Sequence, residues 1–131
     1  MAHELWLQGV TENIQALFIP ASCLVRLMTE KGGNVISIGS HIGHAGVADN
    51  SAYAVSKGAA WAFAQSLALE LKNFDVNVNE LIPGPTKTDM NPSASGPQWK
   101  LPEALHEMAM VLATQDLQHG ATGQSWAMKR V

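Results

Sequence analysis

The sequence predicts an α/β protein built on a parallel sheet, with about three strands and three main helices. Apolar residues recur at helical spacing in three stretches of the chain. Short apolar and β-branched segments lie between these stretches, bounded by turn residues. Because helices and strands alternate, parallel strands joined by right-handed crossovers are expected. The length of 131 residues fits a single domain spanning 1–131.

The first half of the chain contains two predicted helices and one strand. Apolar residues from Val10 to Met28 predict a helix over 9–30, which Gly32 and Gly33 end. The segment 34–40 (NVISIGS) predicts a buried strand. A loop follows, and then an alanine-rich helix over 51–73. Its small side chains would let another helix approach closely.

The second half continues the alternation. The segment 75–82 (DVNVNELI) predicts a strand that the sequence Pro-Gly-Pro ends. Residues 86–100 carry prolines, serines and a glycine, which is typical of a mobile loop. A helix over 102–114 and a short strand over 124–128 complete the predicted layer.

Composition narrows the class of protein. Hydrophobic residues make up 47% of the chain and charged residues 15%, which indicates a globular domain. The net charge of −3 argues against nucleic acid and anionic membranes as partners. Neither a signal peptide nor a membrane span is predicted, because the start lacks a basic region and no apolar run approaches 18 residues. Cys23, expected to be a buried thiol, fits a reducing, cytoplasmic location.

Tyr53 and Lys57 form the first candidate site. They lie four residues apart on one predicted helix, so their side chains share a face. A phenol is a poor base at neutral pH, but an ammonium about 4 Å away stabilises the phenolate by roughly 4 kcal/mol at an effective dielectric near 20. The pair is therefore sufficient for acid/base chemistry, although most such pairs simply lie on a solvated helix face.

Ser40 strengthens the catalytic interpretation. It ends the predicted strand 34–40 at the sheet edge where ligands of α/β folds bind, thirteen residues before Tyr53. The glycine-bearing loop after Ser40 could bring its hydroxyl to the tyrosine.

Four motifs in this order resemble the short-chain dehydrogenase/reductase family. They are ENIQALF around Asn13, NVISIGS ending at Ser40, YAVSK from Tyr53 to Lys57, and VNELIPGPTKT over 78–88. The stretches around Leu112 and 122–124 also resemble the closing helix and strand of that family. The similarity covers nearly the whole chain.

The resemblance implies roles for individual residues. Tyr53 would be the general acid/base, and Lys57 would assist it and hold the ribose of a nicotinamide cofactor. Ser40 would hydrogen-bond the reacting oxygen as charge builds on it. Asn13 would anchor a water that links Lys57 to solvent. The implied reaction is reversible hydride transfer between a small-molecule carbonyl or alcohol and NAD or NADP.

The same resemblance implies a nicotinamide-binding turn. Pro83 and Gly84 would lie along the nicotinamide, Thr86 would contribute to the same cofactor-binding segment, and Thr88 would approach the carboxamide. Tyr53 and Lys57 would also contact the cofactor.

One feature of the family is missing from this sequence. Its members open with βαβ units and a glycine-rich turn that grips the cofactor pyrophosphate. Residues 39–46 (GSHIGHAG) contain spaced glycines, but Ala45 replaces the third glycine and no helix opens there. The chain therefore resembles the C-terminal catalytic half, a partial Rossmann-type doubly wound sheet lacking the N-terminal dinucleotide-binding βαβ units. Only contacts on the nicotinamide side are expected.

The sequence supports other kinds of site less strongly. His41 and His44 lack a third ligand at metal spacing, so no metal site is predicted, and both are expected at the surface or in a substrate pocket. Met90 and Trp99 could cover an apolar substrate or simply anchor the loop. Two functions stay open: a truncated oxidoreductase, or an inactive fragment acting as an oligomerisation partner. In either case helices 9–30 and 51–73 are expected to form a homo-oligomer interface.

Overall fold

The computed structural model describes residues 2–128 as a three-layer α/β fold. The elements run α1 (His3–Lys31), β1 (Gly33–Ile38), α2 (Ser51–Glu70), β2 (Val76–Ile82), α3 (His106–Ala113) and β3 (Ser125–Ala127). Three short 3₁₀ turns, η1 (His41–Gly43), η2 (Lys72–Phe74) and η3 (Pro102–Leu105), connect them. The sheet order is β1-β2-β3, and both pairings are parallel. The predicted fold class is confirmed.

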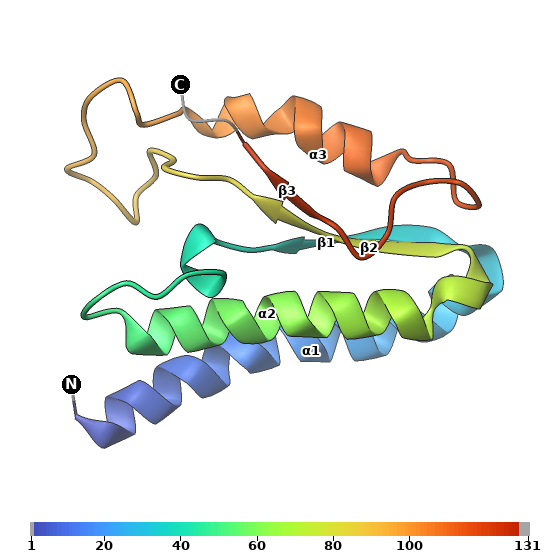
Figure 1. Ribbon diagram of the computed structural model, residues 1–131, viewed down its shortest axis with the longest axis horizontal. Helices are drawn as coiled ribbons and strands as arrows, with labels where there is room; N and C mark the ends of the chain where they lie inside the picture. Colours follow the sequence, from blue (N-terminus) through green and yellow to red (C-terminus); the bar gives the residue numbers. More distant parts are fainter. Residues whose placement is uncertain (1, 129–131) are drawn as a thin grey trace.

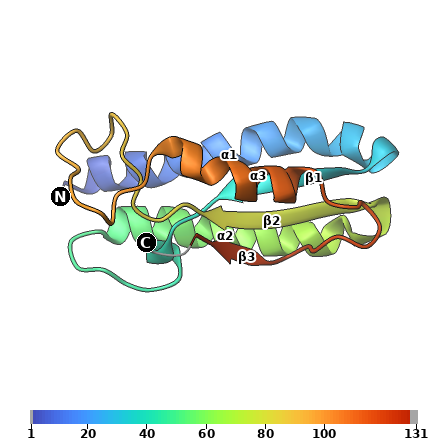
Figure 2. The same ribbon diagram turned by 90° about the horizontal axis from the view of Figure 1, so that it is seen from above.

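Helices cover both faces of the sheet. Figure 1 shows α1 and α2 together on one face and α3 on the other. Figure 2, which views the molecule from above, shows the three strands running side by side. The register pairs Gly33 with Val76 at one end of β1 and Ile38 with Leu81 at the other. All three strands therefore end at the same edge of the sheet, where the loops after β1 and β2 meet.

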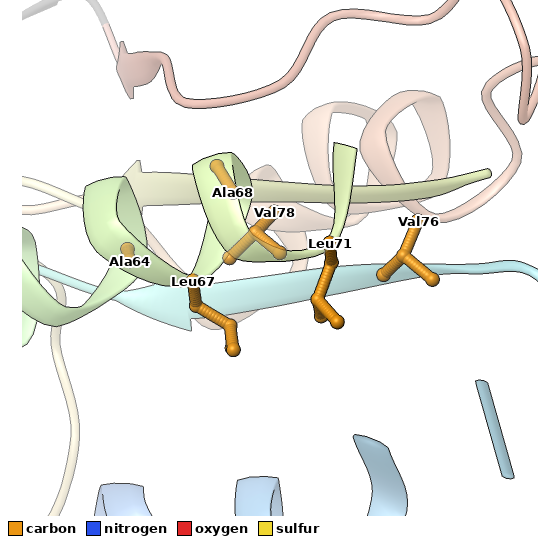
Figure 3. Packing of buried hydrophobic residues seen from close by; sticks show 6 residues of the cluster. All are labelled: Ala64, Leu67, Ala68, Leu71, Val76 and Val78. Carbon is orange, nitrogen blue, oxygen red and sulfur yellow. The ribbon is translucent and has the colours of Figure 1, made fainter. Parts of the chain in front are cut away.

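The core lies between α2 and the sheet. Its buried residues are alternate side chains of β2 and the inner face of α2 (Figure 3): Ala64, Leu67, Ala68, Leu71, Val76 and Val78. Ala64 and Ala68, whose small side chains were predicted to admit another helix, pack in this cluster with Val76 and Val78 of β2. β2 is buried along its whole length, as expected for a central parallel strand covered on both faces.

Buried amides fasten the C-terminal segment to β2. β3 pairs with only three residues of β2, from Glu80 to Ile82. Below them, Asn79 Nδ2 donates to the Ala121 carbonyl (2.8 Å), and Asn77 Nδ2 donates to the Asp116 carbonyl (3.1 Å). The side chains thus replace ladder hydrogen bonds where β3 has not yet begun, as buried polar groups require.

Several element boundaries differ from the prediction. α1 begins at His3 rather than at residue 9, and Trp6 Nε1 donates to Ser51 Oγ (2.9 Å), which joins the added turns to the start of α2. β1 ends at Ile38, two residues before Ser40. β1 was predicted to be buried but is mostly half-buried, because within residues 2–128 it pairs with β2 alone.

The outer face of α1 is more exposed than predicted. Cys23 is exposed, which contradicts the expected buried thiol. Phe18, Ile19, Leu24 and Leu27 each leave half or more of their surface accessible. The apolar residues of this helix outnumber the positions that α2 and β1 can cover, so helical spacing alone did not place Cys23. Within residues 2–128 no helix combines the length and hydropathy that crossing a lipid bilayer requires.

Candidate active site

A cavity of about 670 Å³ opens at the carboxyl ends of β1 and β2. Its walls are the turn after β1, the first turns of α2 and the loop after β2. All but one of the sequence-predicted site residues line it: Ser40, Tyr53, Lys57, Pro83, Gly84, Thr86 and Thr88. This edge is where ligands of open parallel sheets bind, because the strand-to-helix loops diverge there.

Tyr53 and Lys57 lie on one face of α2, as their spacing predicts. Lys57 Nζ lies 5.8 Å from the centroid of the Tyr53 ring and donates to the Ile38 carbonyl at 2.9 Å. The Tyr53 side chain is 44% exposed, so its ring faces the open cavity. The bond to the end of β1 fixes the ammonium between the helix and the sheet and leaves it two further hydrogens to donate.

Two opposing influences act on the Lys57 ammonium. Burial lowers the pKa of Lys57 below the ordinary lysine value, and the negative charge of Glu80 opposes that shift by raising it. Burial is the larger influence, so the ammonium is easier to deprotonate than one in water.

Ser40 reaches the cavity from a turn rather than from the strand itself. Its backbone is extended, and its Oγ accepts a hydrogen bond from the Ile42 backbone N–H (3.3 Å), which caps η1. The prediction that Ser40 ends the strand is therefore wrong by two residues, because the chain leaves the ladder after Gly39 N–H donates to the Leu81 carbonyl (2.9 Å). The side chain still lines the cavity.

The segment after β2 forms the opposite wall. Gly84 has φ = 70°, a left-handed conformation that favours glycine. Thr86 Oγ1 donates to the Gly84 carbonyl (3.1 Å), and Lys100 Nζ donates to the Pro83 carbonyl (3.3 Å). Thr86 and Lys100 also form a parallel β-bridge. The turn is thus held from both ends of the 86–100 loop.

Asn13 is the predicted residue that does not line the main cavity. Its Nδ2 donates to the Gly9 carbonyl one turn earlier on α1 (2.8 Å). It borders two smaller hollows behind the site, one of about 210 Å³ that Lys57 also lines and one of about 220 Å³ that Tyr53 also lines. Asn13 therefore shares smaller hollows with Lys57 and with Tyr53 but does not line the main cavity.

Further residues complete the cavity wall. His41, Met90 and Trp99, which the sequence marked as pocket or lid candidates, all line it. Val47 and Asn50 also do so, and the sequence offered no signal for them because both lie in an irregular loop.

His44 belongs to a different environment from His41. Its Nε2 lies 2.7 Å from Glu80 Oε2, and its ring is tilted by 38° to the Trp61 ring. Within residues 2–128 no three metal-ligating side chains of His, Cys, Asp or Glu gather in one place. Glu80 was missed as a site residue, although a carboxylate that shares one face of the predicted strand with Val76 and Val78 was a signal in the sequence.

Known proteins resemble the chain in both sequence and structure. A mouse (Mus musculus) 3-oxoacyl-[acyl-carrier-protein] reductase is 33% identical over 78 residues, which are 60% of this chain and 33% of the mouse protein. The reductase FabG of Salmonella typhimurium is 32% identical over 99 residues, 75% of this chain and 41% of that protein. The chain thus spans well under half the length of the curated relatives it matches.

Solved structures match nearly the whole chain. Acetoin dehydrogenase from Enterobacter cloacae superposes with a TM-score of 0.84 at 25% identity, covering 98% of this chain and 55% of that one. A protein from Escherichia coli CFT073 solved in complex with NADPH gives 0.85 at 28% identity, covering 97% and 54%. The family model described as short chain dehydrogenase matches residues 1–98. On that match, which covers more than half of its residues, the chain belongs to the short-chain dehydrogenase family.

Proposed function

We propose that this chain carries the catalytic part of an NAD(P)-dependent oxidoreductase that interconverts a carbonyl and an alcohol. The observation that supports this most is the single cavity shared by Ser40, Tyr53, Lys57 and the Pro83–Gly84 turn. These residues come from three separate segments of the chain. Their convergence at the carboxyl edge of the sheet matches the chemistry that the family's oxidoreductases need.

The cavity residues fit the nicotinamide end of the cofactor. The Lys57 ammonium, with two hydrogens left after its bond to Ile38, can donate to ribose hydroxyls. The Pro83–Gly84 turn lines the cavity beside Thr86 and Thr88, whose hydroxyls can bond a carboxamide. When bound there, the cofactor supplies or accepts the hydride. Parallel titrations with NADH and NADPH distinguish NAD from NADP as the cofactor.

The remaining residues transfer the proton and stabilise the negative charge that develops on the reacting oxygen. Tyr53 donates its phenolic proton to the reacting oxygen during reduction and removes it during oxidation. Ser40 donates a hydrogen bond to the same oxygen as negative charge develops. Lys57 stabilises the phenolate by its positive charge. Asn13, beside the hollow that Lys57 also lines, holds water that returns a proton to Lys57.

Turnover of carbonyl compounds tests this proposal. We expect the chain to quench or enhance NADH or NADPH fluorescence and to oxidise that cofactor with one member of a ketone and aldehyde panel. Tyr53→Phe should lower kcat by at least about a hundredfold, the usual value of a general acid/base. Ser40→Ala should lower it by about a hundredfold as well, as loss of an oxyanion donor does.

The matched control is Ser66→Ala, which removes the hydroxyl of an exposed serine on the outer face of α2. It should leave kcat unchanged. A Tyr53→Phe variant that turns over at the parent rate would contradict the proposed chemistry. Absence of cofactor binding at millimolar concentration would contradict the proposed activity, but it would not contradict the family membership.

Association with a second copy is the other candidate function. The exposed apolar residues of α1 support it: Phe18, Ile19, Leu24 and Leu27 lie along a helix that the sequence predicts to be an interface. Exposed apolar patches of this kind mark interaction surfaces. In this function the chain pairs through α1 and α2 and need not turn over substrate.

A further inference from the structure

Glu80 is a buried carboxylate at the centre of the sheet. It is 0% exposed, although it lies only three residues before the Pro83–Gly84 turn of the site. It shares a face of β2 with Val76 and Val78, which pack on α2, so its side chain points toward α2 as well. Burying an ionised group is costly unless partners satisfy it. The groups around Glu80 should therefore include those that stabilise its buried carboxylate.

One carboxylate oxygen is well satisfied and the other is not. Oε2 accepts a hydrogen bond from Ser125 Oγ (2.6 Å) and lies 2.7 Å from His44 Nε2. Oε1 is buried and has no hydrogen-bond partner among the described residues. Ser37, directly opposite Glu80 in the β1–β2 register, has a buried hydroxyl that also lacks one.

The unpartnered side of the carboxylate presses against Gly39. A Cβ atom built on Gly39 would overlap the Glu80 carboxylate, so a larger residue there would require the buried Glu80 side chain to move. Gly39 is the residue immediately before Ser40. The Glu80 side chain therefore limits where the backbone can lie as the chain enters the turn that carries Ser40.

The same turn is held on its other side by α2. A Cβ on Gly43 would lie 2.6 Å from the Lys57 carbonyl carbon, which shows how closely η1 approaches the helix. The His44 ring lies 5.1 Å from the Trp61 ring of α2. The turn 40–44 is thus enclosed between α2 and the Glu80 carboxylate, with His44 as the link between them.

We propose that Glu80 is a positioning residue of the active site, which fastens the Ser40–His44 turn to the sheet through Gly39 and His44 and supplies the buried negative charge that acts on Lys57. The proposal rests on the proposed function for its catalytic meaning. Its structural content stands on the contacts of Glu80 alone. Glu80 touches neither substrate nor cofactor in this scheme, since it does not line the cavity.

The charge of Glu80 has a measurable consequence at Lys57. His44 from the turn and Ser125 from β3 contact the Glu80 carboxylate, and Ser37 of β1 lies opposite it in the register. Lys57 Nζ bonds the carbonyl of Ile38, the residue between Ser37 and Gly39, so its ammonium is held beside the segment that Glu80 adjoins. Because the Glu80 charge raises the pKa of Lys57 against the effect of burial, removing that charge must let the pKa fall further. If Glu80 served only to fill space, replacing it with an uncharged residue of the same size would leave the titration midpoint of Lys57 unchanged.

The Gly39 contact is tested by a double-mutant cycle on the 131-residue chain. Gly39→Ala should lower the urea midpoint strongly when Glu80 is present and much less in a Glu80→Ala background, because the overlapping group is gone. Gly46→Ala is the matched control, since nothing lies within 4 Å of a Cβ at that position. Additive effects of Gly39→Ala and Glu80→Ala would overturn the contact.

The charge is tested by NMR titration of lysine side-chain carbons, with Lys57 assigned by its loss in Lys57→Met. In Glu80→Gln, which keeps the size and hydrogen bonds of the side chain, the Lys57 midpoint should move to lower pH. Glu70→Gln removes an exposed carboxylate from the end of α2 and should leave the midpoint unchanged. An unchanged or raised midpoint in Glu80→Gln would overturn the electrostatic role.

His44→Gln keeps the proposal testable if the Glu80 variants do not fold, because His44 is partly exposed. Amide hydrogen exchange of Gly43 and Ala45, whose N–H groups bond to Ser40 and His41 carbonyls, should speed up in this variant. His106→Gln, an exposed histidine of α3, is its control, and unchanged exchange in His44→Gln would overturn the link. None of these measurements needs a cofactor, so their failure is distinguishable from failure of the proposed oxidoreductase activity.

Discussion

Lys57 shows at the residue scale how position decides chemistry. Its Nζ is drawn toward the sheet by the Ile38 carbonyl and loses solvent there, and burial lowers its pKa while Glu80 resists the change. A lysine in this state gives up its proton at lower pH than an ordinary lysine. In the function that we propose, the hydrogen bonds of Lys57 to ribose hydroxyls and its stabilisation of the Tyr53 phenolate both require the charged ammonium.

This predicts an alkaline loss of cofactor affinity. As pH rises through the lowered pKa of Lys57, the ammonium is lost and NADH or NADPH binding should weaken, beginning below the pH at which a free lysine titrates. Lys57→Arg stays charged, so its affinity should not fall over the same range, even where it is weaker overall. Fluorescence titrations at increasing pH measure this, and identical pH profiles for parent and Lys57→Arg would contradict it.

The sequence alone identifies the pair Tyr53 and Lys57 because helical spacing is a local property. Tyr53 and Lys57 share a face of α2 by their separation of four, whatever the rest of the fold does. The role of Glu80 was missed because it depends on Gly39, His44 and Ser125, which come from two other segments of the chain. Such contacts follow from strand register, which a single sequence does not show.

At the scale of elements, α2 connects the core to the site. Its inner face packs Leu67 against β2, and its first turns carry Tyr53 and Lys57. Truncating Leu67, which is 7% exposed, should lower the free energy of unfolding by about 2–5 kcal/mol through lost burial and a cavity. Leu69, two residues along the same helix, is 76% exposed and is the natural control.

Urea unfolding of the two variants measures the difference. Leu69→Ala should change the free energy of unfolding by no more than about 0.5 kcal/mol, as surface substitutions usually do. Equal destabilisation by Leu67→Ala and Leu69→Ala would mean that α2 does not present the described face to β2.

The type of each element was predictable from the sequence, whereas the residues at which helices and strands begin and end were less predictable. Alternating helical and β-branched patterns identified all three main helices and all three strands. The start of α1 was missed because residues 3–8 have no distinct apolar stripe, and the Trp6–Ser51 hydrogen bond that anchors them is a long-range contact. The end of β1 was misplaced because Gly39 continues one ladder bond before the chain turns at Ser40.

At the scale of the whole molecule, two surfaces of the described chain are suited to association with another chain. β1 has one edge without a strand partner within residues 2–128, and α1 exposes a row of apolar side chains. If α1 pairs two copies, Leu27→Glu should shift the light-scattering mass toward the monomer. Leu101→Glu, equally exposed but outside α1, should not. A parent chain that is monomeric at high concentration would remove the oligomer proposal.

The central claim is that the cavity at the carboxyl edge binds the nicotinamide end of a cofactor. Amide chemical-shift mapping with reduced nicotinamide mononucleotide tests it directly, because this probe lacks the adenosine half. We predict shifts concentrated at Ser40, Lys57, Gly84 and Thr88, which come from three segments lining one cavity. Shifts confined to the apolar face of α1, or no shifts at saturating probe, would contradict the claim.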